Sequence, residues 1–225
     1  MKIEKINEVP ILIHTMDAYS PYWDTWYHLF KKYVKNHGPI YFLTEDKEPS
    51  FVDEVIHIKS GKGEWGYRLK KGFEQVPSDI LFYMQEDYWV HSPFEFKQEY
   101  LDKFYELNMH CLRFNKNAWG EIDYLKTEGN LYRYSQYSRY LMGHQMGLWN
   151  KDFFNSNVFD NENPWDSELS GTVRWYNTEH RIYQYDINWY SSTCRRGELQ
   201  QVGRDILEKN GITNFDDTPI PRQSN

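Results

Sequence analysis

Short apolar runs alternate with longer amphipathic segments through the first half of this chain. The segments between the runs carry apolar residues at spacings of three and four, which is typical of helices packed on one face. Strands that alternate with helices of this length indicate βαβ units. We therefore predict an α/β fold with a Rossmann-like mixed, mainly parallel central sheet flanked by helices. The predicted strands are 9–15, 39–46, 53–59, 79–85 and 110–114, and the predicted helices are 20–38, 64–76 and 94–108.

The second half of the chain, from about residue 115, is less regular. MGLW has the character of a strand, WNKDFFNS of a helix start, and NENPWDSELSGTVRWY of a loop that leads into a helix. We find no internal repeat and no low-complexity linker, so we expect a single domain over 1–225. Its halves are about 9–114 and about 115–215, and 216–225 is predicted to be a frayed tail.

The composition narrows the classes of partner. The chain has 33 acidic against 26 basic residues, a formal net charge of -7, and it lacks a Lys/Arg-rich run, which disfavours nucleic acid as a partner. No apolar stretch approaches the length of a membrane span, and the first ten residues lack the apolar core of a signal peptide. We expect a cytoplasmic protein, of the organism or of an infected host cell. Cys111 and Cys194 are far apart in sequence, which favours buried free thiols.

Three of the predicted strands, 9–15, 39–46 and 79–85, end in polar or acidic residues. The carboxyl ends of parallel strands lie along one sheet edge, where ligands bind in open α/β folds. The side chains predicted to share a cleft there are Thr15, Asp17, Asp46, Glu86 and Asp87. An acidic pair that ends a buried strand suits a hard cation, Mn²⁺ or Mg²⁺, which prefers carboxylate and phosphate oxygens. The alternative is that this strand simply reaches solvent.

Several common cofactor and nucleophile motifs are absent from the sequence. It contains no GxxxxGK[ST] loop, no GxGxxG opening a helix, no GxSxG and no HExxH. The predicted cleft therefore has carboxylates, aromatic rings and a few basic residues with which to bind a ligand. Trp65 and Arg68 lie one helical turn apart, and an arginine suits bidentate contact with phosphate. A solvated helix arginine is the alternative.

The order of three segments resembles GT-A-fold glycosyltransferases that use nucleotide sugars, in particular bacterial polysaccharide enzymes and those of large algal viruses. The first segment is HTMDAYSPYWDTW, the second is GEWGYRLKKGFEQVPSDILFYMQEDYWV, and the third is HQMGLWNKDFF followed by ENPWDSE. In this resemblance the first half of the chain binds the nucleotide sugar and the second half faces the acceptor. The usual acidic motif is Asp-x-Asp, whereas this chain has Gln85-Glu86-Asp87.

The resemblance implies a role for each of these segments. Asp87 is the metal ligand, with Mn²⁺ or Mg²⁺ as the cofactor. Donor contacts, with a UDP-sugar favoured, are expected from Thr15, Asp17, Tyr19, Asp46, Trp65, Arg68, Gln85 and Glu86. Glu168, with Asp166 as the second choice, is the base that deprotonates an acceptor hydroxyl of a glycan or glycoprotein, with inversion at the anomeric carbon. Acceptor contacts are expected from His144, Gln145 and Trp165.

Other functions remain open from the residues alone. Two carboxylates with many aromatic residues also suit a glycoside hydrolase. The Gln at the first motif position keeps open a non-enzymatic glycan- or nucleotide-binding protein. Asp166 and Glu168 also suit helix N-terminal positions, where acids stabilise the helix dipole.

Overall fold

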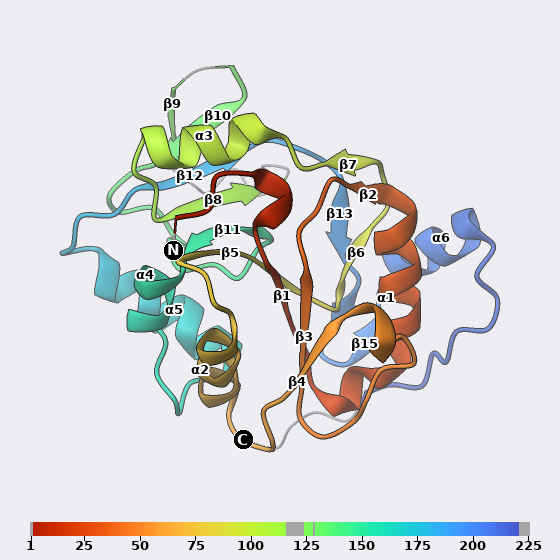
Figure 1. The fold of residues 1–225 in the computed structure, drawn as a ribbon. Helices are drawn as coiled ribbons and strands as arrows, with labels where there is room; N and C mark the ends of the chain where they lie inside the picture. The colour runs from red at the N-terminus through yellow and green to blue at the C-terminus, as the bar shows by residue number, and fades with distance from the viewer. Residues whose placement is uncertain (1, 116–123, 128, 221–225) are drawn as a thin grey trace.

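A nine-stranded mixed sheet forms the centre of the computed structural model, which describes residues 2–115, 124–127 and 129–220 (Figure 1). The strands on one side of the sheet, β4, β3, β1 and β5, are parallel, as predicted. β11 then runs antiparallel to both of its neighbours, β5 and β8. In sheet order the strands are β4 (Ile56–Lys59), β3 (Ile40–Thr44), β1 (Ile11–His14), β5 (Ile80–Gln85), β11 (Gly147–Asn150), β8 (Cys111–Phe114), β12 (Ile182–Tyr185), β10 (Leu131–Tyr134) and β9 (Tyr124–Lys126).

Helices cover both faces of the sheet and define two apolar cores. One core contains side chains of α1 (Ser20–Tyr33), α3 (Gln98–Glu106) and α6 (Gln201–Asn210). The other contains side chains of α2 (Trp65–Gln75), α4 (Lys151–Ser156) and α5 (Pro164–Trp175). The predicted α/β class with flanking helices is thus confirmed.

Short elements complete the chain around this framework. Three two-stranded ribbons pair β2 (Val34–Lys35) with β7 (Phe94–Glu95), β6 (Tyr88–Val90) with β13 (Tyr190–Ser192), and β14 (Cys194–Arg195) with β15 (Glu198–Leu199). Three 3₁₀ turns span Ile6–Glu8, Asp17–Tyr19 and Val52–Glu54. Among the described residues no helix is long and apolar enough to cross a bilayer. Of the predicted tail, 216–220 has no helix or strand, and 221–225 lies outside the described residues.

Most differences from the predicted elements lie at their ends. The helix predicted over 20–38 stops at Tyr33, because the chain continues into β2 and pairs with β7. The strand predicted over 53–59 starts only at Ile56, after a 3₁₀ turn. The helix predicted from residue 94 starts at Gln98, since Phe94 and Glu95 belong to β7. At the two helices the pairing of β2 with β7 overrides the local apolar spacing.

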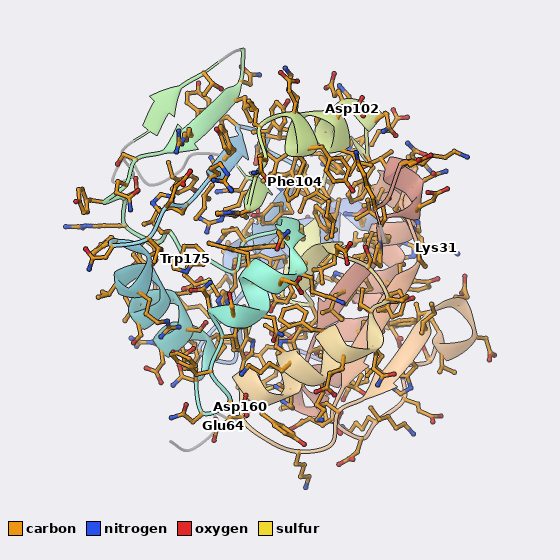
Figure 2. All side chains as sticks on the ribbon, turned by 60° about the vertical axis from the view of Figure 1, so that its left-hand side comes forward. Lys31, Glu64, Asp102, Phe104, Asp160 and Trp175 are labelled. Carbon is orange, nitrogen blue, oxygen red and sulfur yellow. The ribbon has the colours of Figure 1, made fainter. Side chains whose placement is uncertain are left out.

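The start of α2 is docked on the loop between α4 and α5. The amides of Gly66 and Tyr67 donate to the carbonyls of Glu162 and Asp160, at 3.0 and 3.1 Å. The Lys70 ammonium also lies 2.8 Å from the Asp160 carboxylate. Figure 2 shows Asp160 beside Glu64, the residue that precedes α2. This contact joins the helix that follows β4 to the loop that leads into α5.

Gly66 is the residue that permits this contact. A Cβ at Gly66 would lie 1.9 Å from the carbonyl oxygen of Phe159, which is backbone and cannot rotate away. We expect Gly66→Ala to lower the free energy of unfolding by about 1–3 kcal/mol, the usual cost of overpacking. Urea denaturation measures this change.

Gly72→Ala is the matched control on the same helix. Its Cβ would meet no backbone, only the ends of the Leu43 and Leu12 side chains, at 2.8 and 3.3 Å, while alanine gains about 1 kcal/mol of helix propensity. We expect it to be nearly neutral. Equal losses from the two variants would contradict the assigned role of the Gly66 contact.

Candidate functional site

The ends of β1, β3 and β5 meet at one edge of the sheet. His14, the last residue of β1, is in register with Leu43 of β3 and with Gln85 of β5. The loops that follow these strands therefore start side by side. Thr15 continues the ladder, its amide donating to the Leu43 carbonyl at 3.0 Å. The structure thus brings together the loops that carry the predicted polar side chains.

Asp17 ties the loops after β1 and β3 to each other. Its carboxylate accepts hydrogen bonds from the amides of Glu45, Asp46 and Lys47, at 3.2, 3.0 and 3.0 Å. In return the Asp17 amide donates to the Glu45 carboxylate at 2.9 Å. The Asp17 oxygens are therefore engaged in shaping the loop, while the Asp46 side chain is exposed beside them.

Arg68 is completely buried, which excludes the solvated helix arginine. Its Nη1 donates to the Thr15 carbonyl at 2.6 Å and its Nε to the Gly63 carbonyl at 3.2 Å. Its Nη2 has no partner among the described residues. Burial lowers the pKa of Arg68, and the negative charges of Glu45 and Glu86 oppose that change. One unsatisfied cationic N–H thus remains behind the loop after β1.

Trp65 stacks on His144 with ring centroids 4.3 Å apart and planes 14° apart. His14 lies against the same indole at 5.4 Å. Both imidazoles are buried, and burial, aided by Arg113, lowers the pKa of His144 to about 3. The rings are neutral at physiological pH. In this cluster of rings, His14 Nε2, Trp65 Nε1 and both ring nitrogens of His144 are buried without hydrogen-bond partners among the described residues.

Glu86 and Asp87 have different surroundings. The favourable neighbours of the Glu86 carboxylate are Thr15 and Arg68, on the side of β1 and α2. Those of Asp87 include Ser192 of β13, and the Glu168 carboxylate lies close enough to raise its pKa. Burial raises the pKa of both groups, that of Asp87 to about 7. Asp87 Oδ1 is buried without a hydrogen-bond partner in the described structure.

Glu168 on α5 comes to Asp87 from the second half of the chain. Its Oε1 accepts a hydrogen bond from the backbone amide of His144 at 2.9 Å. Burial raises the pKa of Glu168, while that amide and the charge of Arg113 lower it. The result is a partly buried carboxylate that is fixed at one oxygen and whose charge raises the pKa of Asp87.

The segment ENPWDSE places its acids in three different settings. Glu162 is buried in an ion pair with Arg174, at 2.7 Å. Asn163 caps α5 by accepting from the Asp166 amide at 2.9 Å, and its Nδ2 donates to the Asp166 carboxylate at 2.6 Å. Asp166 is exposed, whereas Glu168 is partly buried and its charge acts on Asp87. Trp165 is 66 % exposed, one helical turn before Glu168.

Two glutamines hold tyrosine hydroxyls at this edge. Gln85 Nε2 donates to the Tyr83 hydroxyl at 3.2 Å. Gln145 Nε2 donates to the Tyr88 hydroxyl at 3.1 Å, and the Tyr190 hydroxyl donates to Gln145 Oε1 at 2.7 Å. Sequence reasoning missed these three tyrosines, although Tyr88 directly follows the acidic pair.

Tyr19, directly before α1, lies near Glu86 at the same edge. It is partly exposed, and burial, followed by the charge of Glu86, raises the pKa of its phenol. Its ring lies edge to face on Tyr22, with centroids 5.8 Å apart. Cys194, which interacts with both phenols, is a buried free thiol, and so is Cys111, as predicted.

The side chains at this edge offer few ligands for a metal ion. Within residues 2–115, 124–127 and 129–220 no three His, Cys, Asp or Glu side chains are arranged to hold one. A cation that also takes phosphate oxygens needs only one or two carboxylates. The unpartnered Asp87 Oδ1, with Glu86 adjacent, fits that requirement.

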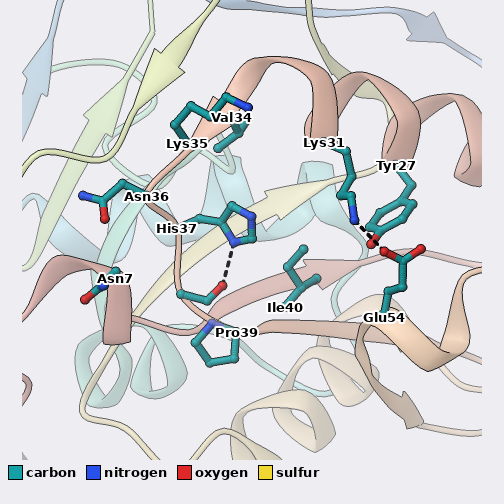
Figure 3. Close-up of a pocket in the computed structure, with 11 residues that line it drawn as sticks. Asn7, Tyr27, Lys31, Val34, Lys35, Asn36, His37, Pro39, Ile40 and Glu54 are labelled. Atoms are coloured by element: carbon teal, nitrogen blue, oxygen red, sulfur yellow. Dashed lines mark hydrogen bonds and ion pairs between the residues drawn. The ribbon is translucent and has the colours of Figure 1, made fainter.

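A cavity of about 620 Å³ lies at the opposite edge, where β3 begins (Figure 3). Lys31 is paired there with Glu54 at 2.5 Å, and His37 Nδ1 lies 2.8 Å from the Gly38 carbonyl. None of its lining side chains is among the buried unpartnered groups of the described chain. It contains none of the predicted site residues, and we assign it no role.

The fold is shared with solved nucleotide-sugar proteins at low identity. S. aureus TarS 1-349 in complex with UDP is similar at 12 % identity and a TM-score of 0.55, over 81 % of this chain and 59 % of that chain. The same TarS fragment in complex with UDP-GlcNAc matches at 12 % identity and a TM-score of 0.55, over 90 % of this chain and 65 % of that one. An apo UDP-glucose pyrophosphorylase matches at 10 % identity and a TM-score of 0.50, over 82 % and 92 %.

These matches confirm the GT-A-like fold class. This chain spans about three fifths of the TarS fragment and 41 % of a longer TarS chain. They do not support the viral branch of the resemblance. No family model matches the chain, and no curated protein matches it.

The raised pKa of Asp87 predicts a pH-dependent cost to stability. Because the folded pKa of about 7 lies above the ordinary aspartate value of 3.8, the stabilisation from the bound proton is fully present below pH 3.8 and is lost as the pH rises through 7. In EDTA at about pH 8, we expect the free energy of unfolding of Asp87→Asn to exceed that of wild type by at most ~4 kcal/mol. The variant should therefore unfold at a higher temperature. The two should converge at about pH 4.

Asp152, exposed on α4, is the control for this experiment. Asp152→Asn is expected to leave the pH dependence of unfolding unchanged. An Asp87→Asn variant that parallels wild type from pH 4 to 8 would show that Asp87 is solvated rather than desolvated.

Proposed function

We propose that this protein is a glycosyltransferase that moves a sugar from a nucleoside diphosphate sugar, with a UDP-sugar favoured, to a glycan or glycoprotein hydroxyl. The observation that carries the proposal is the electrostatic interaction of Asp87, from the first half of a GT-A-like fold, with Glu168, from the second half, whose carboxylate is held by the His144 amide at 2.9 Å. Both carboxylates are desolvated, and Asp87 Oδ1 has no partner in the described structure. TarS, which shares the fold, was crystallised with UDP and with UDP-GlcNAc.

The donor side of the proposed site comprises the loops after β1, β3 and β5. Tyr19 offers a partly exposed ring to the base, and Gln85 and Asp46 lie at the same edge. Arg68 contributes its unpaired Nη2, a charge suited to a phosphate, behind Thr15. Trp65 supports this side through its stack on His144. Asp17 acts by holding the loop after β3 in place.

Mn²⁺ or Mg²⁺ is the proposed cofactor. Asp87 is the residue that would hold it, with Glu86 as the second carboxylate. When bound, such an ion neutralises negative charge on the diphosphate and makes it a better leaving group.

Glu168 is the proposed general base. The acceptor hydroxyl oxygen attacks the anomeric carbon, the bond from that carbon to the diphosphate oxygen breaks, and the hydroxyl proton passes to the carboxylate. Attack on the face opposite the leaving group inverts the anomeric centre. The amide of His144 fixes the direction of the Glu168 carboxylate, since it occupies one oxygen and leaves the other for the proton. Trp165, exposed one turn away, is the proposed platform for an acceptor sugar ring.

Replacement of the two predicted bases distinguishes their roles. We expect Glu168→Gln to lower kcat about 10²- to 10⁴-fold, the range for loss of a general base, with donor affinity changed less than about threefold. Asp166→Asn is expected to lose less than about fivefold, because Asp166 is exposed and bonded to its own helix cap. UDP release from UDP-glucose and UDP-GlcNAc, with Mn²⁺ and a panel of glycan acceptors, measures both.

Two results would overturn the assignment. A larger loss in Asp166→Asn than in Glu168→Gln would exchange the two residues. Release of monosaccharide from an oligosaccharide without any nucleotide, dependent on Asp87 and Glu168, would show a hydrolase instead.

A further inference from the structure

Tyr88 is placed at the centre of the candidate site by a short ribbon. It is the first residue of β6, directly after Asp87, and it pairs with Ser192 of β13. Tyr190 lies two residues along β13 and thus on the same face of the ribbon. The two phenol rings meet edge to face with centroids 5.3 Å apart.

The hydrogen bonds around Gln145 leave the Tyr88 proton available. A phenol hydroxyl both donates and accepts. Gln145 Nε2 donates to the Tyr88 oxygen at 3.1 Å, which uses its accepting side. The Gln145 carbonyl oxygen in turn accepts from Tyr190 at 2.7 Å, so both ends of the Gln145 amide are engaged by phenol hydroxyls. The network therefore directs the Tyr88 O–H away from Gln145.

The surroundings of Tyr88 are those of the proposed reaction. Burial raises the pKa of its phenol, and the neighbouring charges of Asp87 and Glu168 raise it further. The Tyr88 phenol therefore lies near both carboxylates of the proposed site.

We propose that Tyr88 is a substrate-binding residue whose hydroxyl donates a hydrogen bond to a hydroxyl oxygen of the donor sugar. Gln145 and Tyr190 are positioning residues that aim it. The inference rests on the proposed function, because the sugar reaches this place only if its diphosphate is held beside Asp87. The donor sugar is favoured over the acceptor because Tyr88 is adjacent in the chain to Asp87, and the donor sugar is bonded directly to the diphosphate.

Tyr88→Phe tests the proposal, since it removes only one hydroxyl and keeps the ring. Calorimetric titration with UDP, UDP-glucose and UDP-GlcNAc in Mn²⁺ separates the nucleotide from the sugar. We expect UDP affinity within about twofold of wild type, and affinity for the sugar nucleotide that wild type prefers to fall about 3- to 10-fold, the worth of one hydrogen bond.

Tyr190→Phe and the double variant test whether Tyr190 acts through Gln145 and Tyr88. We expect Tyr190→Phe to weaken binding of the UDP-sugar by a smaller factor, and to add less than about twofold when Tyr88 is already Phe, because both changes act through one bond. Tyr100→Phe, a buried tyrosine of α3, is the control for loss of a phenol hydroxyl elsewhere in the protein.

The outcomes separate this inference from the proposed function. A wild-type protein that binds none of the three nucleotides refutes the proposed function. Wild-type protein that binds UDP-sugars, with Tyr88→Phe losing nothing or losing UDP affinity by the same factor, overturns the role of Tyr88 alone. If the effects of the two tyrosine substitutions are fully additive, Tyr190 does not act through Tyr88.

Discussion

The pairing of β5 on both of its edges determines the rest of this structure. On one edge β5 runs parallel to β1, and on the other it runs antiparallel to β11. It is therefore the strand at which the parallel N-terminal sheet meets the mixed C-terminal one. The residues that follow it, Glu86 and Asp87, leave the sheet between the two halves. Loops from β1 and α2 reach Glu86 from one half, and α5 and β13 reach Asp87 from the other.

This arrangement costs stability where the two halves meet. Burial disfavours the charged forms of Asp87 and Glu168, and several buried nitrogens nearby have no partner among the described residues. Desolvated carboxylates and unsatisfied donors at one sheet edge are typical of a binding site, because a ligand supplies the missing partners. The apolar cores on both faces of the sheet, with fully buried Trp26 and Trp149, offset this cost.

The sequence predicted the framework better than the details of the site. Buried runs ending in Thr15 and in Glu86-Asp87 were sufficient to predict which loops meet, because parallel strands share a carboxyl edge. The engagement of the Asp17 carboxylate and the burial of Arg68 were not predictable, since both depend on contacts between loops far apart in sequence. The resemblance ranked Glu168 above Asp166, and the capping bond of Asn163 supports that order because it holds Asp166 at the exposed start of α5.

The central claim is that the edge around Asp87 binds a nucleoside diphosphate through a divalent cation. Calorimetric titration of UDP into wild type and Asp87→Asn, each with Mn²⁺ and with EDTA, tests it most directly. We expect binding to wild type that depends on Mn²⁺ and weakens at least about tenfold in Asp87→Asn, because a metal ligand is lost. Equal UDP affinity in both proteins, or no binding of UDP to wild type with Mn²⁺, would contradict it.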